Sequence, residues 1–171
     1  MMGTFTFGKV GDLTVYGGIP CDIKDAWDCF VDCADIFFTD YDNVYDANSW
    51  ACFAATRITD VALARNKAGE ICCISYVMPE TADSLCFHAG CRPDHRKPSI
   101  SIPCAQLAIR YFFLTHQVRR MSVVGLWKNR VARLCAMKLG FTIDGRPRSI
   151  APVKGEFLDV YYGSLLRKEV M

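Results

Sequence analysis

Basic side chains gather between a stretch typical of a half-buried strand and an apolar stretch typical of a helix. Three basic residues and two hydroxyl residues follow one another there: Arg92, Arg96, Lys97, Ser99 and Ser101. The first amides of a helix lack partners within it and lie at the positive end of its dipole. The segment 92–101 is therefore predicted to bind phosphate. The plainer alternative is a solvated basic turn before a capped helix.

The same region holds four side chains of the kinds that bind zinc: Cys86, His88, Cys91 and His95. Their spacing, C-x-H-x2-C-x3-H, matches no common zinc motif, and structural zinc needs four ligands in a tetrahedron. A phosphate-binding turn already accounts for these residues, so no metal is expected. His88 remains a candidate general base, because a neutral imidazole accepts protons. A lone histidine on a strand is more often simply packed or hydrogen-bonded.

The composition is that of a globular protein, and a single domain is expected over residues 1–171. Apolar residues make up 51% and charged residues 22%, which excludes a disordered chain. No apolar run is long enough to span a bilayer, and residues 1–13 lack the features of a signal peptide. Ten cysteines without a CxxC motif then predict free thiols in a reducing cytoplasm.

The charge is divided unevenly along the chain. Residues 1–83 carry 13 acidic and 5 basic residues, a net charge of −8, whereas residues 84–171 carry 5 acidic and 15 basic residues, a net charge of +10. We expect an anionic ligand on the second half, and on the first half either a cationic ligand or only a solvated surface. Aromatic residues do not interleave with the basic ones, so a nucleic-acid partner is not expected.

Hydrophobic periodicity predicts alternating strands and helices. The predicted strands are 13–16, 61–65, 71–78, 84–91, 121–127, 142–151 and 156–166. The predicted helices are 22–38, about 48–57, 101–115 and 129–141, the last ended by Gly140. A hairpin turn is expected at 66–69. The acidic, aromatic segment 39–49 reads as a loop, and its candidate acceptor-binding residues are Tyr41, Asp42 and Tyr45.

The segment Asn129-x-x-Ala132, followed by Leu139-Gly140-Phe141, resembles the fourth helix of the GNAT superfamily of N-acetyltransferases. The tail is similar to the branch that acetylates protein N-termini and polyamines. Its matching residues are Gly145, Arg146, Arg148, Gly155, Asp159, Tyr162, Leu165, Leu166, Arg167 and Glu169. The resemblance covers about residues 10–170. It implies an α/β (α+β) fold: a mixed, mostly antiparallel central sheet of about seven strands flanked by about four helices.

The resemblance also implies a coenzyme site. In that superfamily the turn carries Q/R-x-x-G-x-G/A and cradles the pyrophosphate of acetyl-CoA. Here the run is Arg96-x-x-Ser99-x-Ser101, with serine at both glycine positions and Pro98 beside them. The residues implied to bind acetyl-CoA are Cys91, Arg92, Arg96, Lys97, Ser99, Ile100, Ser101 and Asn129.

The implied reaction passes the acetyl group of acetyl-CoA, a cosubstrate, directly to a primary amine. The acceptor would be a protein N-terminus, a lysine or a polyamine, and the acidic stretch 22–46 favours a cationic one. Ala136 stands where the family often has a general-acid tyrosine. The candidate catalytic residues are His88, Cys135 and Tyr162. The alternative is a catalytically inactive GNAT-fold binding or assembly protein. Members of this fold often pair, so a homodimer is a further expectation, and no membrane partner is expected.

Overall fold

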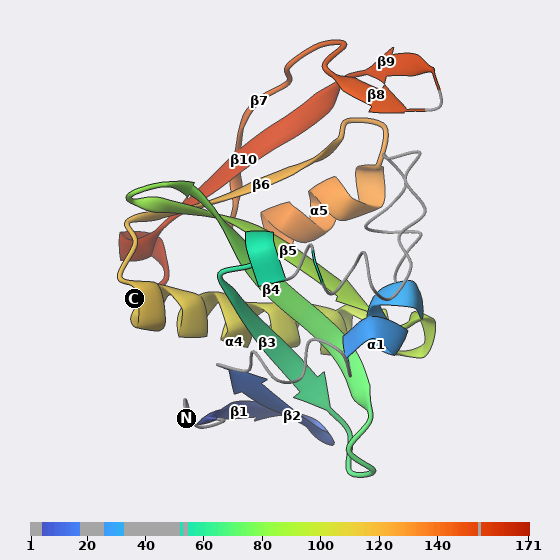
Figure 1. Ribbon diagram of the computed structural model, residues 1–171, viewed down its shortest axis with the longest axis vertical. Helices are drawn as coiled ribbons and strands as arrows, with labels where there is room; N and C mark the ends of the chain where they lie inside the picture. Colours follow the sequence, from blue (N-terminus) through green and yellow to red (C-terminus); the bar gives the residue numbers. More distant parts are fainter. Residues whose placement is uncertain (1–4, 18–25, 33–51, 53–54, 154) are drawn as a thin grey trace.

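A computed structural model describes residues 5–17, 26–32, 52, 55–153 and 155–171 (Figure 1). The strands are β1 (Phe5–Val10), β2 (Leu13–Gly17), β3 (Asp60–Arg65), β4 (Ile71–Thr81), β5 (Ser84–Cys91), β6 (Arg120–Leu126), β7 (Thr142–Gly145), β8 (Ala151–Val153), β9 (Glu156–Leu158) and β10 (Val160–Leu166). The helices are α1 (Ala26–Asp32), α4 (Pro98–His116) and α5 (Arg130–Lys138), with short 3-10 turns η2 (Pro93–His95) and η3 (Arg167–Glu169).

Eight strands form one twisted sheet in the order β1-β2-β3-β4-β5-β6-β10-β7. Every neighbouring pair is antiparallel except β5 and β6, which are parallel. Parallel strands need a long crossover, and α4 supplies it. β8 and β9 form a separate two-stranded hairpin between β7 and β10. The predicted mixed, mostly antiparallel sheet is confirmed.

Two helices cover opposite faces of this sheet. α4 lies behind the central strands and α1 in front of them (Figure 1). The α4 face holds the main hydrophobic cluster, in which Phe112 is 0% exposed and contacts Phe87 of β5 at a ring-centroid distance of 6.2 Å. On the other face, Phe30 of α1 packs in a second cluster with Tyr76 of β4. The main sheet therefore has helices on both faces.

The observed elements follow most of the predicted ranges. β5 has the predicted bounds, and the hairpin turn after β3 is confirmed by the amide of Gly69, which donates to the carbonyl of Asn66 at 3.0 Å. Within the predicted helix 22–38, the structure describes only α1. Residues 55–57 are helical, inside the range predicted for a second helix.

Two predicted strands are wrong in extent, β1 was not predicted, and β8 shares only Ala151 with a predicted strand. The strand predicted over 142–151 ends at Gly145, because Pro147 has no amide for a ladder and Ser149 has a left-handed φ of 53°. The strand predicted over 156–166 is divided at Asp159 into β9 and β10. The side chain of Asp159 accepts a hydrogen bond from the amide of Ser149 at 3.0 Å. β1 pairs only with β2 and so lies at the sheet edge.

Gly17 at the end of β2 lies against the ring of Tyr111. A Cβ built on Gly17 would lie 2.4 Å from Tyr111 Cζ. Tyr111 belongs to α4, and its side chain is buried. We expect Gly17→Ala to lower the free energy of unfolding by about 1–3 kcal/mol, because the ring must shift in a packed site. Urea unfolding checks this. Gly145→Ala is the matched control, since its Cβ would meet only Pro147 Cδ at 4.0 Å; equal losses in both variants would contradict the packing argument.

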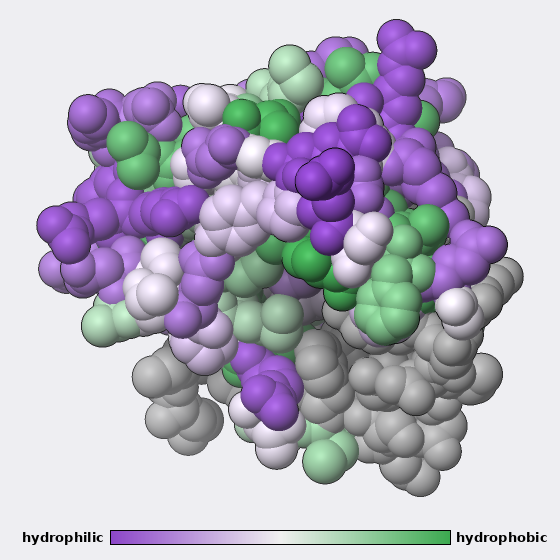
Figure 2. Space-filling model, turned by 90° about the horizontal axis from the view of Figure 1, so that it is seen from above, coloured by the Kyte–Doolittle hydropathy of each residue, from purple (hydrophilic) through white to green (hydrophobic). Residues whose placement is uncertain are grey.

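Among the described residues seen from above, hydrophilic and hydrophobic areas are mixed (Figure 2). Among the described residues, no helix is both long and apolar enough to cross a membrane.

Candidate functional site

The parallel strands β5 and β6 pair over only three residues. The pairs are Ser84 with Arg120, Leu85 with Met121, and Cys86 with Ser122. Beyond Cys86 the two strands separate, so residues 87–91 of β5 have no partner strand on that side within the described chain. We call the opening between residues 87–91 and the end of β6 the fork. An unpaired strand edge inside a sheet is a place where an extended ligand can form backbone hydrogen bonds.

The backbone of β5 presents its polar groups to the fork at alternate residues. Cys91 is the register partner of Cys73, and the amide of Arg92 donates to the carbonyl of Cys72 at 2.9 Å. This bond marks Cys73 and Cys91 as a pair that is not itself hydrogen-bonded. The N–H and C=O groups of Cys91, and those of Ala89 two residues earlier, therefore point away from β4 and into the fork. The Cys91 carbonyl accepts a bond from Arg96 Nε at 2.9 Å, whereas the Cys91 amide and both backbone groups of Ala89 have no strand partner on this side among the described residues.

The basic turn leads directly from the fork into α4. The helix starts at Pro98, three residues before the predicted start, because the fixed φ of proline suits the first helical position. The amides of Ile100 and Ser101 both donate to the carbonyl of Lys97. In the part of the chain that is described, the amides of Lys97 and Ser99 have no hydrogen-bond partner. These two amides lie at the positive end of a 19-residue helix, which favours an anion.

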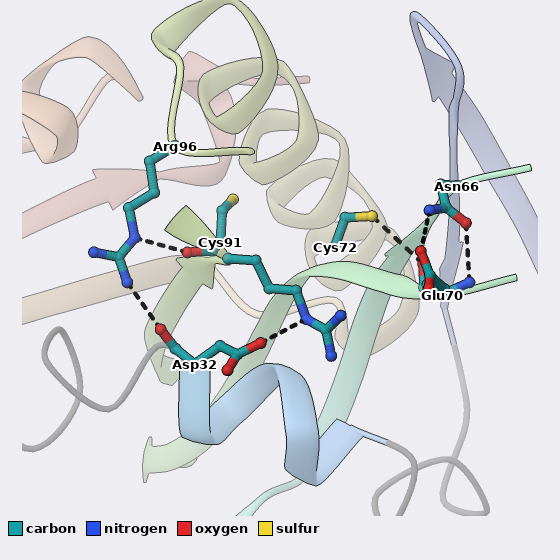
Figure 3. Close-up of polar contacts among 7 residues, drawn as sticks. Asp32, Asn66, Glu70, Cys72, Cys91 and Arg96 are labelled. Atoms are coloured by element: carbon teal, nitrogen blue, oxygen red, sulfur yellow. Dashed lines mark hydrogen bonds and ion pairs between the residues drawn. The ribbon is translucent and has the colours of Figure 1, made fainter. Parts of the chain in front are cut away.

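The two arginines of the turn contact the end of α1. Arg96 Nε donates to the carbonyl of Cys91 at 2.9 Å, and its Nη2 donates to the carbonyl of Asp32 at 3.0 Å (Figure 3). Arg92 Nε lies 3.1 Å from Asp32 Oδ2 in an ion pair. Asp32 is thus in direct contact with both predicted phosphate-binding guanidinium groups. Sequence reasoning did not single out Asp32 among the acidic residues of its helix.

Asn129 lies at the start of α5, where it acts as the N-cap. Its Oδ1 accepts the amide of Ala132 at 3.0 Å. The side-chain amide nitrogen of Asn129 remains a potential donor, in line with the predicted contact to the coenzyme arm. Ala136 is buried in the main cluster, and because its side chain is a methyl group it has no proton to donate to a leaving group. Its neighbour Cys135 is partly buried.

His88 lies two residues beyond Cys86, the last residue of β5 that pairs with β6, on the face that carries α1. Its ring stacks on Tyr76 at 4.8 Å with an interplanar angle of 9°, and its Nε2 lies 3.5 Å from Cys86 Sγ. Burial lowers the pKa of His88 to about 4, so the imidazole is neutral at pH 7. It is in the form that accepts a proton, although a pKa this low makes it a weak base.

This pKa has a measurable consequence for stability. A histidine that titrates near 4 when folded and near 6.5 when unfolded lets the unfolded state take up the proton first as the pH falls. The wild type should therefore lose stability relative to His88→Gln between pH 6.5 and 4, by on the order of 2 kcal/mol. Urea unfolding of both proteins at several pH values measures the difference. A constant difference across this range would show that His88 is not buried in the neutral form.

Tyr162 on β10 forms a polar cluster with Glu80 of β4 on the same face as His88. The Tyr162 hydroxyl donates to Glu80 Oε1, and Ser84 Oγ donates to Glu80 Oε2 at 2.9 Å. The guanidinium of Arg120 lies 5.3 Å from the Tyr162 ring centroid. Burial works to raise the pKa of Glu80, but these hydrogen bonds and the Arg120 charge outweigh it and lower the pKa. Glu80, which sequence reasoning missed, is thus an ionised carboxylate beside the closed end of the fork.

Tyr41, Asp42 and Tyr45 lie outside the described residues. Within the described residues, no group of three or more His, Cys, Asp and Glu side chains is arranged to hold a metal ion. A shallow groove over α4 contains no residue of the basic turn or of β5; it is lined by Lys9, Val10, Pro103, Gln106, Leu107, Ile109, Arg110, Leu139, Glu169 and Val170.

The fold is shared with crystal structures of acetyltransferases. A GNAT-family acetyltransferase from Bacillus anthracis superposes with a TM-score of 0.75 at 14% identity, covering 94% of this chain and 98% of that one. Ribosomal-protein-S5-alanine acetyltransferase from Vibrio fischeri gives 0.74 at 11% identity, covering 99% of each chain. Spermidine N-acetyltransferase from Vibrio cholerae, in complex with CoA and spermine, gives 0.76 at 11% identity, covering 94% and 98%.

The sequence itself matches no family model and no curated protein. The superpositions nevertheless extend over almost the whole chain, so the chain has the GNAT fold, as predicted. Identities of 11–14% establish this shared fold only.

Proposed function

We propose that the protein is an acetyl-CoA-dependent N-acetyltransferase. The observation that carries the proposal is the continuity of three features: an edge of β5 at Ala89 and Cys91 that no described strand covers, a basic turn, and the N-terminus of α4. The strand edge suits an extended amide-containing arm, and the turn suits a pyrophosphate. Acetyl-CoA carries both groups in this order, and the GNAT fold is shared with acetyltransferases.

The coenzyme phosphates would be held by Arg92, Arg96 and the amides of Lys97 and Ser99. Ser99 and Ser101 replace the glycines of the family motif, and Ser101 Oγ donates to the carbonyl of Lys97 at 3.2 Å. The Ser101 hydroxyl is thus a third donor to a carbonyl that also accepts the amides of Ile100 and Ser101. Lys97 adds charge at an exposed position.

The transfer itself is a direct attack by the amine on the acetyl carbonyl carbon. The C–N bond forms, the C–S bond breaks, and the coenzyme leaves as a thiolate. A thiol of pKa near 8.5 leaves without obligatory protonation, so the buried Ala136 does not prevent the reaction. The amine must lose a proton, and His88 is the first titratable side chain on β5 beyond the last residue paired with β6. Positioning in the fork supplies the remaining acceleration.

The acceptor is proposed to be a cationic amine. Glu80 is ionised beside Tyr162 on the face that bears His88, and residues 1–83 carry a net charge of −8. A peptide with a free N-terminus, a lysine peptide and spermidine cover the chemical range. Cys135 and Tyr162 remain proposed participants, and the Tyr162 hydroxyl stays protonated because burial and Glu80 raise its pKa.

The test is an assay of acetyl transfer from acetyl-CoA to these three amines. Release of the coenzyme thiol measures the rate, and mass spectrometry identifies the product. We expect a product that gains one acetyl group. Coenzyme binding without turnover on any of the amines would instead favour the alternative, a GNAT-fold binding or assembly protein.

A further inference from the structure

Asp32, the last residue of α1, contacts both arginines of the basic turn. Its carboxylate Oδ2 lies 3.1 Å from Arg92 Nε, and its carbonyl accepts from Arg96 Nη2 at 3.0 Å. Figure 3 shows the Asp32 carboxylate and carbonyl directed toward the turn. These contacts join residues about sixty positions apart in the chain, so the fold, and not local sequence, brings them together.

The donors that Asp32 engages are those that phosphate recognition uses. A guanidinium binds phosphate with its Nε and Nη groups, in the geometry it also uses for a carboxylate. A phosphate that reaches Arg92 therefore meets a carboxylate already paired with it, and at Arg96 it meets the main-chain carbonyl of Asp32.

We infer that the Asp32 carboxylate competes with the coenzyme phosphates for Arg92, and so sets the affinity of the coenzyme site. The inference rests on the proposed function, because it takes the anion to be the phosphates of coenzyme A. Binding of the coenzyme weakens the contact between the turn and α1, and by reciprocity a tighter α1 contact weakens the coenzyme. A role in holding the arginines ready for phosphate would have the opposite sign.

The experiment is calorimetric titration of the full chain with coenzyme A, using wild type, Asp32→Asn, Asp32→Ala and Asp94→Asn. Asp94 is the matched control: it is an exposed carboxylate on η2 in the same turn and forms no ion pair among the described residues. Asp94→Asn makes the same change in net charge as Asp32→Asn. Asp32→Ala is included because asparagine keeps a side-chain oxygen that could face Arg92, whereas alanine does not. Urea unfolding checks that every variant is folded.

We expect Asp32→Asn and Asp32→Ala to bind coenzyme A about 3- to 10-fold more tightly than wild type, as loss of a partly exposed ion pair and of charge repulsion allows. Asp94→Asn should change the affinity less than about 2-fold. Binding by the Asp32 variants alone, with none by wild type, would support the competition more strongly.

Three results would overturn the inference. If wild type binds and the Asp32 variants bind no more tightly than Asp94→Asn, Asp32 does not compete, and the proposed function stands. If the Asp32 variants bind more weakly than wild type, Asp32 positions the arginines instead. If no protein in the series binds coenzyme A, the proposed function and the competition both fall.

Discussion

Arg96→Ala should weaken acetyl-CoA binding about 10- to 100-fold, the loss expected for a charged hydrogen bond of roughly 1.5–3 kcal/mol. The side chain has two roles that alanine removes. It provides a cation at the turn, and its Nε ties the turn to the carbonyl of Cys91 at the end of β5. Calorimetric titration with acetyl-CoA measures the change.

Arg110→Ala is the matched control for Arg96→Ala. Arg110 is an exposed arginine on α4, fourteen positions along the chain from Arg96, so its removal changes the net charge equally without touching the turn. We expect less than about a 2-fold effect on acetyl-CoA affinity. Equal losses in both variants would mean that overall charge, and not the turn, accounts for the binding.

Phe112→Ala should lower the free energy of unfolding by about 3–5 kcal/mol, the cost of removing a large buried ring and leaving a cavity. Phe112 is 0% exposed at the centre of α4's buried face, where its ring meets Phe87 of β5 at 6.2 Å and Tyr111 at 5.2 Å. The same contact holds the fork strand against the helix that begins at the turn. Urea unfolding gives the value.

Leu114→Ala provides the comparison within the same helix. Leu114 is 47% exposed, so its truncation should cost about 1 kcal/mol or less. A loss for Phe112→Ala no larger than this would contradict the assignment of α4 as the main packing element of the sheet.

The sequence predicts the central elements well because their patterns are strong. The apolar runs of β4 and β5 and the nearly all-apolar α4 leave few alternatives, and Gly140, with a φ of 101°, ends α5 as predicted. The bounds of the C-terminal strands were predicted wrongly, because single residues determine where these strands end. Asp159 interrupts an apolar run by binding Arg146 and the amide of Ser149, a tertiary contact that periodicity does not reveal.

The candidate site was predictable only where it is contiguous in sequence. The basic turn from Arg92 to Ser101 and the cap at Asn129 are local features, so their residue types indicate their roles. Asp32 and Glu80 were missed for a different reason. Each contacts its partner across 60 or more positions, with Asp32 on Arg96 and Glu80 on Tyr162, and many other acidic residues in the first half of the chain look equivalent to them.

The central claim is that the turn and the fork bind acetyl-CoA, and calorimetric titration of the wild-type protein with acetyl-CoA tests it most directly. We predict one site per chain with a dissociation constant in the micromolar range, about −8 kcal/mol. No binding at millimolar acetyl-CoA would contradict the account, and the fork would then have to be explained as part of a GNAT-fold protein that binds other partners.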